Sequence, residues 1–246
     1  MEIFLSTKVA KTLADIHEQN KKLLDFTRIA THNLRSHSSN LSGILNILNK
    51  ATTEKEKLEL LNYLQDISTG FKETLDNLDE IAAVQWNAGV EKEKLNLLKA
   101  VNRAIKVLKF NIKQANAIVN IDISKSINLK FNAAYLDSII LNLISNAIKY
   151  RHPKRKLIIT ISAEMKQNKL FFSVSDNGVG IDLNKHKHDI FGLYKTFTNH
   201  SEAKGYGLYI TKCQVEAMGG SIEAKTNEKF GTRFEINFIY EGTISN

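Results

Sequence analysis

The strongest indication of the fold is the stretch NLISNAIKY at residues 142–150. It closes a predicted helix that begins at Ala133 and ends at about Tyr150. Asn132 is a residue type that caps helix N-termini, and Pro153 stands just beyond the expected end.

Two stripes of residues run along this predicted helix. The apolar stripe, expected to face the core, consists of Leu136, Ile139, Ile140, Leu143 and Ala147. Asn142, Asn146 and Lys149 are spaced four and three residues apart, so they share a second, polar stripe. Amide oxygens suit Mg²⁺, and an ammonium group beside them suits a phosphate. Taken alone, a polar stripe is more often an ordinary solvated helix face.

Two glycine motifs follow further along the chain. The first, DNGVGI at residues 176–181, comes directly after an apolar strand, and the second, GYGL at residues 205–208, opens a helix. A carboxylate at a strand end can accept a hydrogen bond from an exocyclic amine, and glycines allow a ligand to approach the backbone closely. A helix start offers unpaired N–H groups to phosphates. Each motif alone is weak evidence, since turns are rich in the same residues.

The first 90 residues are predicted to form a helical hairpin. Between residues 13 and 48 apolar side chains recur alternately every three and four positions, and a second such pattern runs over 61–85. Thr53 followed by Glu56 has the spacing of a capping box at the start of the second helix. A lone hairpin buries little apolar surface, so we expect two chains to pair into a dimeric four-helix bundle.

The remainder of the chain mixes helices and strands. Strands are expected at 118–123, 157–163, 170–175, 221–225 and 232–238, and further helices at 98–110 and 207–218. The fold class is therefore α+β, with helices packed on a mixed or antiparallel sheet. We divide the chain into a hairpin domain, residues 1–90, and a sheet-containing domain, residues 91–246.

The three polar motifs in this order resemble the ATP-binding domain of sensor histidine kinases, an α/β sandwich shared with the gyrase and MutL ATPases. The segment from Ile190 to Phe197 resembles the phenylalanine box of the kinases, and Gly231 to Phe234 resembles their closing strand. The resemblance runs from about Leu95 to Phe238 and implies a Mg-ATP site.

The resemblance also implies a role for each matching residue. Asn146 would bind Mg²⁺ with support from Asn142, Lys149 would approach the phosphates, and Tyr150 would lie against the adenine. Asp176 would hold the adenine amine. The neighbouring glycines would shape the walls: Gly178 and Gly180 at the adenine, and Gly205 and Gly207, followed by Leu208, at the triphosphate. The segment between the glycine motifs would act as a lid.

Upstream, the sequence FTRIATHNLRS at residues 26–36 resembles the phosphoacceptor box of the same kinases. In the heptad pattern His32 falls at position f, farthest from the apolar seam, and is expected to be exposed. With the ATP-site motifs downstream, His32 is the candidate phosphoacceptor and Asn33 its candidate catalytic neighbour.

The implied function is an ATP-dependent protein-histidine kinase that autophosphorylates His32 and passes the phosphoryl group to an aspartate of a response-regulator receiver domain. An alternative is a nucleotide-binding dimeric adaptor of the same fold with degenerate kinase activity. It is supported by His37, where the family usually has proline, and by Tyr209, where it usually has a third glycine. A separate sensor protein or an upstream sensor domain would supply the signal.

Composition excludes several other classes. The single Cys213 rules out a disulfide framework, and no apolar run is long enough to cross a bilayer. We therefore expect a cytoplasmic chain without a membrane span. The net charge of +8 invites a nucleic-acid interpretation, but the basic residues are scattered and lack interleaved aromatic side chains, so no nucleic-acid partner is expected.

Overall fold

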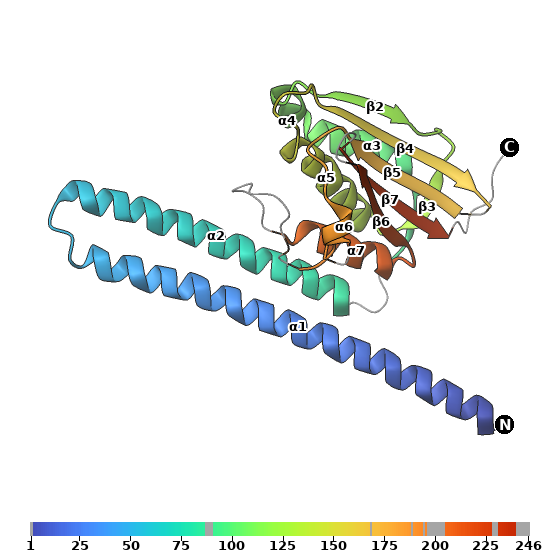
Figure 1. Ribbon diagram of the computed structural model, residues 1–246, viewed down its shortest axis with the longest axis horizontal. Helices are drawn as coiled ribbons and strands as arrows, with labels where there is room; N and C mark the ends of the chain where they lie inside the picture. Colours follow the sequence, from blue (N-terminus) through green and yellow to red (C-terminus); the bar gives the residue numbers. More distant parts are fainter. Residues whose placement is uncertain are drawn as a thin grey trace. The chain divides into compact units, whose positions relative to one another are not determined.

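The computed structural model describes residues 2–86, 91–167, 169–187, 189–193, 195, 205–227 and 231–239 (Figure 1). The chain forms two compact units, Met1–Glu80 and Ile81–Asn246. The boundary between the two units falls inside the second long helix, and the end of that helix, which includes the buried Ile81, groups with the second unit.

The first unit is the predicted helical hairpin. Helices α1 (Glu2–Leu48) and α2 (Glu54–Trp86) are joined by a short turn (Figure 1). The capping box is confirmed: Thr53 Oγ1 accepts from the Glu56 N–H at 3.3 Å, and Glu56 Oε2 accepts from the Thr53 N–H at 3.2 Å. The hydrogen bond from the Thr53 backbone, with further bonds from Thr53 and Thr52, holds the pKa of the Glu56 carboxyl below its usual value.

The apolar seam of the hairpin is only partly covered within one chain. His37 is half-buried between the helices, with its Nε2 3.0 Å from Thr74 Oγ1 and its ring centre 5.5 Å from that of Phe71. The following seam residues remain between 37% and 61% exposed: Leu13, Ile16, Leu23, Leu41, Leu61, Phe71 and Leu75. Apolar surface of this extent is what a second hairpin would cover.

The second unit contains a five-stranded mixed sheet in the order β2-β4-β5-β7-β6. Its strands are β2 (Ile118–Asp122), β4 (Ile158–Lys166), β5 (Lys169–Asp176), β6 (Ser221–Asn227) and β7 (Gly231–Ile239). Only the β2–β4 pair is parallel among the described strands of this sheet, because α5 connects the region of β2 to β4. The α+β fold predicted from the sequence is confirmed.

Helices cover one face of this sheet (Figure 1). Helix α5 (Ala133–Lys149) lies between α3 (Leu97–Val107) and α7 (Gly207–Ala217), and the short α6 (Leu183–His186) precedes the second glycine motif. As predicted, Asn132 caps α5, its Oδ1 accepting from the Tyr135 N–H at 3.0 Å. The apolar stripe of α5 is buried in the core, and the separate polar stripe lines a cleft.

One local expectation was wrong, and one small sheet was not predicted. The helix predicted over 98–110 is divided at Leu108 into α3 and α4 (Lys109–Gln114). A two-stranded antiparallel sheet, β1 (Glu93–Asn96) with β3 (Asn128–Phe131), was not anticipated, because each strand is only four residues long and its partner lies far away in the sequence.

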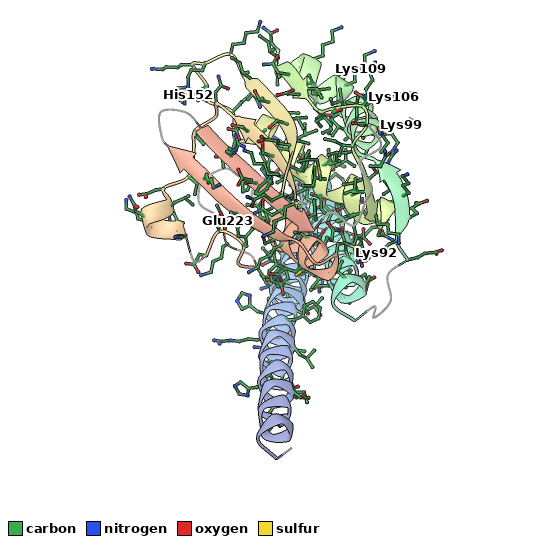
Figure 2. All side chains as sticks on the ribbon, turned by 90° about the vertical axis from the view of Figure 1, so that its right-hand side faces the viewer. Lys92, Lys99, Lys106, Lys109, His152 and Glu223 are labelled. Atoms are coloured by element: carbon green, nitrogen blue, oxygen red, sulfur yellow. The ribbon has the colours of Figure 1, made fainter. Side chains whose placement is uncertain are left out.

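The positive charge is less scattered than the sequence suggests. Lys99 and Lys106 lie seven positions apart on α3 and, with Lys109 on α4, project from one side of the second unit (Figure 2). Arg103, which is also on α3, forms an ion pair with Asp137, with 2.7 Å between Arg103 Nη2 and Asp137 Oδ1. Within the described ranges, no helix is both long enough and apolar enough to cross a membrane.

Candidate active site

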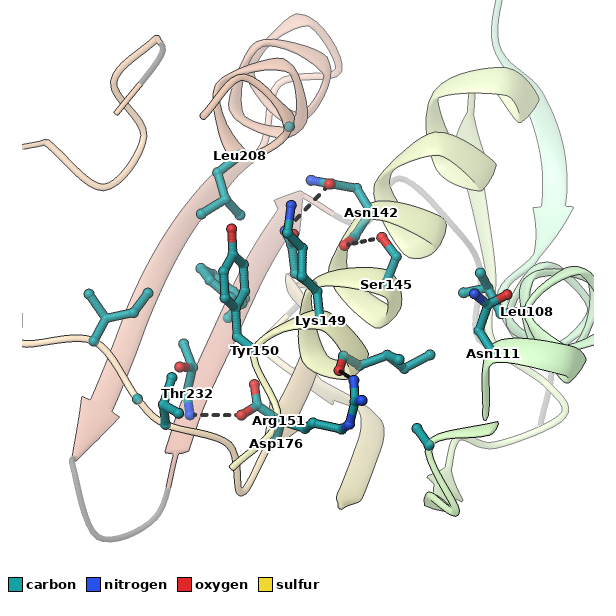
Figure 3. A pocket seen from close by; sticks show the side chains of 18 of the residues that line it. Leu108, Asn111, Asn142, Ser145, Lys149, Tyr150, Arg151, Asp176, Leu208 and Thr232 are labelled. Carbon is teal, nitrogen blue, oxygen red and sulfur yellow. Dashed lines mark hydrogen bonds between the residues drawn. The ribbon is translucent and has the colours of Figure 1, made fainter. Parts of the chain in front are cut away.

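A cleft of about 630 Å³ opens in the second unit beside the C-terminal half of α5 (Figure 3). Nine residues predicted to bind the nucleotide line it: Asn142, Asn146, Lys149, Tyr150, Asp176, Gly180, Gly205, Gly207 and Leu208. Gly178, the tenth, lies directly behind the wall that Asp176 and Tyr150 form. The structure thus brings the three sequence motifs together around one cavity.

Asp176 is the most perturbed titratable group of the cleft. It ends β5, is only 9% exposed, and its Oδ1 accepts from the Gly178 N–H at 2.7 Å and from the Thr232 N–H at 3.4 Å (Figure 3). Burial raises the pKa of this carboxyl to about 6, although the two N–H groups and the charge of Arg155 oppose the rise. Both of these hydrogen bonds reach Oδ1, and a buried carboxylate that offers its other oxygen to a ligand can recognise an amine donor.

The loop after Asp176 has no room for larger side chains. A Cβ on Gly178 would meet the Tyr150 carbonyl oxygen and, at 2.7 Å, Asp176 Oδ1. Gly231 has a φ of +83°, and a Cβ there would meet the Asp176 carbonyl oxygen and, at 2.6 Å, the Gly178 nitrogen. Gly231 and Thr232 therefore complete the wall around Asp176; the sequence placed them only in a closing strand.

The same loop is tied to its surroundings from both sides. Arg155 donates to the Gly178 carbonyl at 2.7 Å, and the Asn177 side chain accepts from the Ile158 N–H at 2.8 Å while donating to the Lys156 carbonyl at 2.9 Å. Asn177 thus has a structural role, and Arg155 is a supporting residue without any motif that could have revealed it.

Tyr150 and Lys149 form the end of α5 in the cleft. The Tyr150 carbonyl accepts from the Val179 N–H at 3.0 Å, which joins the helix end to the glycine loop. Burial raises the pKa of the Tyr150 hydroxyl. The Lys149 ammonium lies 5.5 Å from the centre of the Tyr150 ring and reaches the same side of the cleft (Figure 3).

The amide side chains of the polar stripe are joined to each other and to α7. Asn146 Nδ2 donates to Asn142 Oδ1 at 3.4 Å, and Asn142 Nδ2 donates to Thr211 Oγ1 at 2.7 Å. Together with the hydroxyl of Ser145, which also lines the cleft, they form an oxygen-rich, uncharged donor set of the kind that suits Mg²⁺ bound chiefly by phosphates and water. No cluster of three or more His, Cys, Asp or Glu side chains that could hold a metal occurs among the described residues.

Part of the expected lid, which spans the segment between the glycine motifs, lies outside the described residues, because these omit 188, 194 and 196–204. Of the phenylalanine box, Ile190 is buried, and the Phe191 ring packs edge-on against Phe234 with 6.4 Å between ring centres. Lys195 also lines the cleft.

The candidate phosphoacceptor lies in the other unit. His32 is exposed on α1, as its heptad position predicts, and its Nδ1 lies 3.4 Å from Asn33 Oδ1. An amide oxygen accepts a proton in a hydrogen bond and does not donate one, so this contact favours the tautomer with the proton on Nδ1 and the lone pair on Nε2.

Comparisons with known proteins agree with this description. Residues 132–241 match the family described as Histidine kinase-, DNA gyrase B-, and HSP90-like ATPase. The chain is 22% identical over 214 residues to the heme sensor protein HssS of Staphylococcus saprophyticus, a match that covers 87% of this chain and 46% of HssS. The chain thus spans less than half the length of this relative.

Two solved structures share the fold. The Acinetobacter baumannii histidine kinase AdeS gives a TM-score of 0.64 at 20% identity, covering 86% of this chain and 98% of that chain. The histidine kinase ThkA, solved in complex with the response regulator protein TrrA, gives a TM-score of 0.69 at 19% identity, covering 89% of this chain and 63% of that chain.

The fold and the cleft therefore define an ATPase-type domain of this family over residues 132–241. The resemblance to sensor histidine kinases deduced from the sequence motifs is confirmed, because the family matched by residues 132–241 and the kinase relatives both agree with it.

Proposed function

We propose that the protein is an ATP-dependent protein-histidine kinase whose phosphoacceptor is His32. The observation that carries the proposal is the cleft that unites Asp176, Asn146 and Lys149 in one chain with an exposed histidine on a hairpin helix. The kinase relatives support the class of reaction. The division into a dimerisation and phosphotransfer hairpin and a catalytic ATP-binding domain is part of the same proposal.

In this proposal the cleft holds ATP at two places, the adenine and the phosphates. The Asp176 carboxylate accepts a hydrogen bond from the adenine amine, Tyr150 lies against the base, and the Lys149 ammonium neutralises phosphate charge. The N–H groups at the start of α7, reached through Gly205 and Gly207, face the phosphates. When bound, Mg²⁺ would neutralise charge on the phosphate oxygens, and the Asn146 side chain with support from Asn142 would hold it.

The transfer step requires the lone pair of His32. Its Nε2 forms a bond to the γ-phosphorus, and the bond from that phosphorus to the bridging oxygen of ADP breaks. The proton on Nδ1 becomes more acidic and leaves to water, because the Asn33 amide can orient the ring but cannot act as a base. The phosphoryl group then passes from Nε2 to an aspartate carboxylate of a receiver domain: the nitrogen–phosphorus bond breaks as the oxygen–phosphorus bond forms, and the ring takes up a proton from water, which regenerates the neutral imidazole.

The exposed seam supports a homodimer through the hairpins. Burial of apolar surface contributes roughly 25 cal/mol per Å², and the seam residues that stay exposed in one chain would be covered by a second copy. A partner protein or a further domain would deliver the signal.

Phosphate mapping tests the proposal. After incubation with Mg-ATP labelled at the γ-phosphate, we expect acid-labile label on His32 and none in a His32→Gln variant. A matched His37→Gln variant, altered at a half-buried histidine on the same helix, should keep the label. Asn146→Ala should abolish labelling. If the wild-type protein binds nucleotide and acquires no acid-labile phosphate, the degenerate adaptor is the correct function.

A further inference from the structure

Thr211 forms a hydrogen bond with Asn142, one of the two asparagines whose side chains line the cleft. It lies on α7, its side chain is only 1% exposed, and its Oγ1 accepts a hydrogen bond from Asn142 Nδ2 at 2.7 Å. This is the shorter of the two amide hydrogen bonds, since Asn146 Nδ2 lies 3.4 Å from Asn142 Oδ1. Neither glycine motif nor the polar stripe of α5 includes Thr211.

The two hydrogen bonds give the chain of amides a direction. Asn142 uses its nitrogen toward Thr211 and therefore turns its oxygen toward Asn146. Asn146 donates from its nitrogen to this oxygen, so its own Oδ1 is the amide atom that can face a cation. A threonine inside a helix can give its hydroxyl proton to the carbonyl four residues earlier, which keeps its lone pairs for an external donor such as Asn142.

The packing around Asn142 leaves little freedom for another arrangement. A Cβ on Gly207, at the start of α7, would meet Asn142 Oδ1 and, at 3.2 Å, Asn142 Nδ2. The Asn142 amide is thus held between the backbone of Gly207 and the hydroxyl of Thr211, one turn apart on the same helix. An amide that turned end for end would present nitrogen where a cation needs oxygen.

We infer that Thr211 is a positioning residue for the cation: its hydroxyl orients Asn142, and Asn142 orients Asn146 so that the Asn146 carbonyl oxygen faces Mg²⁺. This inference rests on the proposed Mg-ATP function. Residues that do not bind a metal themselves but orient its ligands typically contribute about 10- to 100-fold to metal affinity. We expect the loss of the Thr211 hydroxyl to weaken cation binding by a factor in this range.

If Thr211 only stabilised the fold, its replacement would weaken ATP binding equally with and without Mg²⁺. The chain offers a matched control for this possibility. Gln214 on α7 donates through Nε2 to the Ser138 hydroxyl on α5 at 3.1 Å. This hydrogen bond joins the same two helices one turn farther along, between residues other than Asn142 and Asn146. Ser138→Ala therefore removes a comparable hydroxyl without disturbing the direction of the amides.

The experiment measures the ATP dissociation constant of the full chain with excess Mg²⁺ and again with EDTA, for the wild type and each variant. The dissociation constant in EDTA divided by the dissociation constant in Mg²⁺ reports how much the cation increases the affinity for ATP. We expect Thr211→Val to lower this ratio about 10-fold or more while ATP binding in EDTA stays within about twofold of the wild type. Thr211→Ser should restore the ratio, and Ser138→Ala should leave it unchanged. Thr211→Ala compared with Thr211→Ser isolates the hydroxyl if the valine variant folds poorly.

Three results would overturn the inference. The first is a wild-type ratio in Thr211→Val, the second an equal loss in Ser138→Ala, and the third a parallel loss of affinity with and without Mg²⁺. A wild-type protein that binds ATP equally well in Mg²⁺ and EDTA would instead refute the proposed cation site itself. A wild type that binds no ATP would refute the proposed function.

Discussion

Replacing Asp176 by asparagine should make the free protein more stable and the nucleotide complex weaker. The carboxyl is 9% exposed, and burial raises its pKa from 3.8 to about 6. The folded state therefore holds the proton more tightly than the unfolded chain does. The favourable contribution of the protonated group is complete below about pH 4 and is lost as the pH rises through 6.

The expected gain in stability follows from the difference between the pKa values of Asp176 in the unfolded and the folded protein. A difference of about two pH units, at about 1.4 kcal/mol each, makes ionisation of Asp176 in the folded state unfavourable by about 3 kcal/mol above pH 7. An asparagine cannot ionise, yet its Oδ1 can still accept from the N–H groups of Gly178 and Thr232. We therefore expect Asp176→Asn to be more stable than the wild type at pH 8, by up to about 3 kcal/mol.

The assay is thermal or urea denaturation of both proteins between pH 4 and 8. The stability difference should shrink as the pH falls from 7 to 4, where the wild-type carboxyl is protonated. Asp122→Asn, which removes the same charge from an exposed position on β2, controls for the loss of one negative charge. A difference between Asp176→Asn and the wild type that is equal at pH 4 and pH 8 would show that this reasoning is wrong.

The same substitution should act in the opposite direction on ATP. A hydrogen bond to a charged acceptor contributes about 1.5–3 kcal/mol, so its replacement by an amide should weaken ATP binding by about tenfold or more at pH 8. If binding is unchanged, Asp176 does not contact the adenine amine.

Three further predictions concern other parts of the chain. Asn33→Ala should slow autophosphorylation by roughly 10-fold while Asn33→Asp keeps or raises the rate; an aspartate variant as slow as the alanine variant would contradict an orienting role for Asn33. Light scattering at micromolar concentration should give twice the chain mass for the wild type and for Ser39→Asp, off the seam, but a single-chain mass for Leu41→Asp; a wild-type monomer would refute the bundle. Gly231→Ala should lower the free energy of unfolding by more than Gly219→Ala does, because both glycines have a positive φ (+83° and +79°) but only Gly231 lacks space for a Cβ. Equal losses in denaturant titrations would show that the contact with Asp176 is unimportant.

Local signals in the sequence predicted the local structure well. The cap at Asn132 and the capping box of Thr53 and Glu56 depend on residues three positions apart, and both are present. The strands β1 and β3 were missed because neither has enough residues to show alternation, and their pairing depends on a partner more than 30 positions away. The break at Leu108 was missed because the apolar period continues across it.

In the site, too, contacts within one helix could be predicted from the sequence, whereas contacts between distant residues could not. Asn142, Asn146 and Lys149 could be grouped from their spacing, because one helix holds all three on one side. Thr211 could not, because its contact with Asn142 joins residues 69 positions apart in different helices. Gly231 stood in the matched closing strand, but only the structure shows that it abuts Asp176.

The cleft is organised around α5, which fixes both of its ends. At the C-terminal end the Tyr150 carbonyl holds the glycine loop through Val179, and one turn earlier the side chain of Asn146 begins the amide chain that ends on α7. The distance between the proposed adenine wall and the proposed phosphate end is therefore set within a single helix, whose apolar face is buried in the core. A rotation of α5 would move both ends together, so substitutions in its buried face should change nucleotide affinity without touching the nucleotide. The pH dependence of Asp176 and the Mg²⁺ dependence of Thr211 report on the two ends separately, and together they distinguish a rotation of α5 from damage to one end of the cleft.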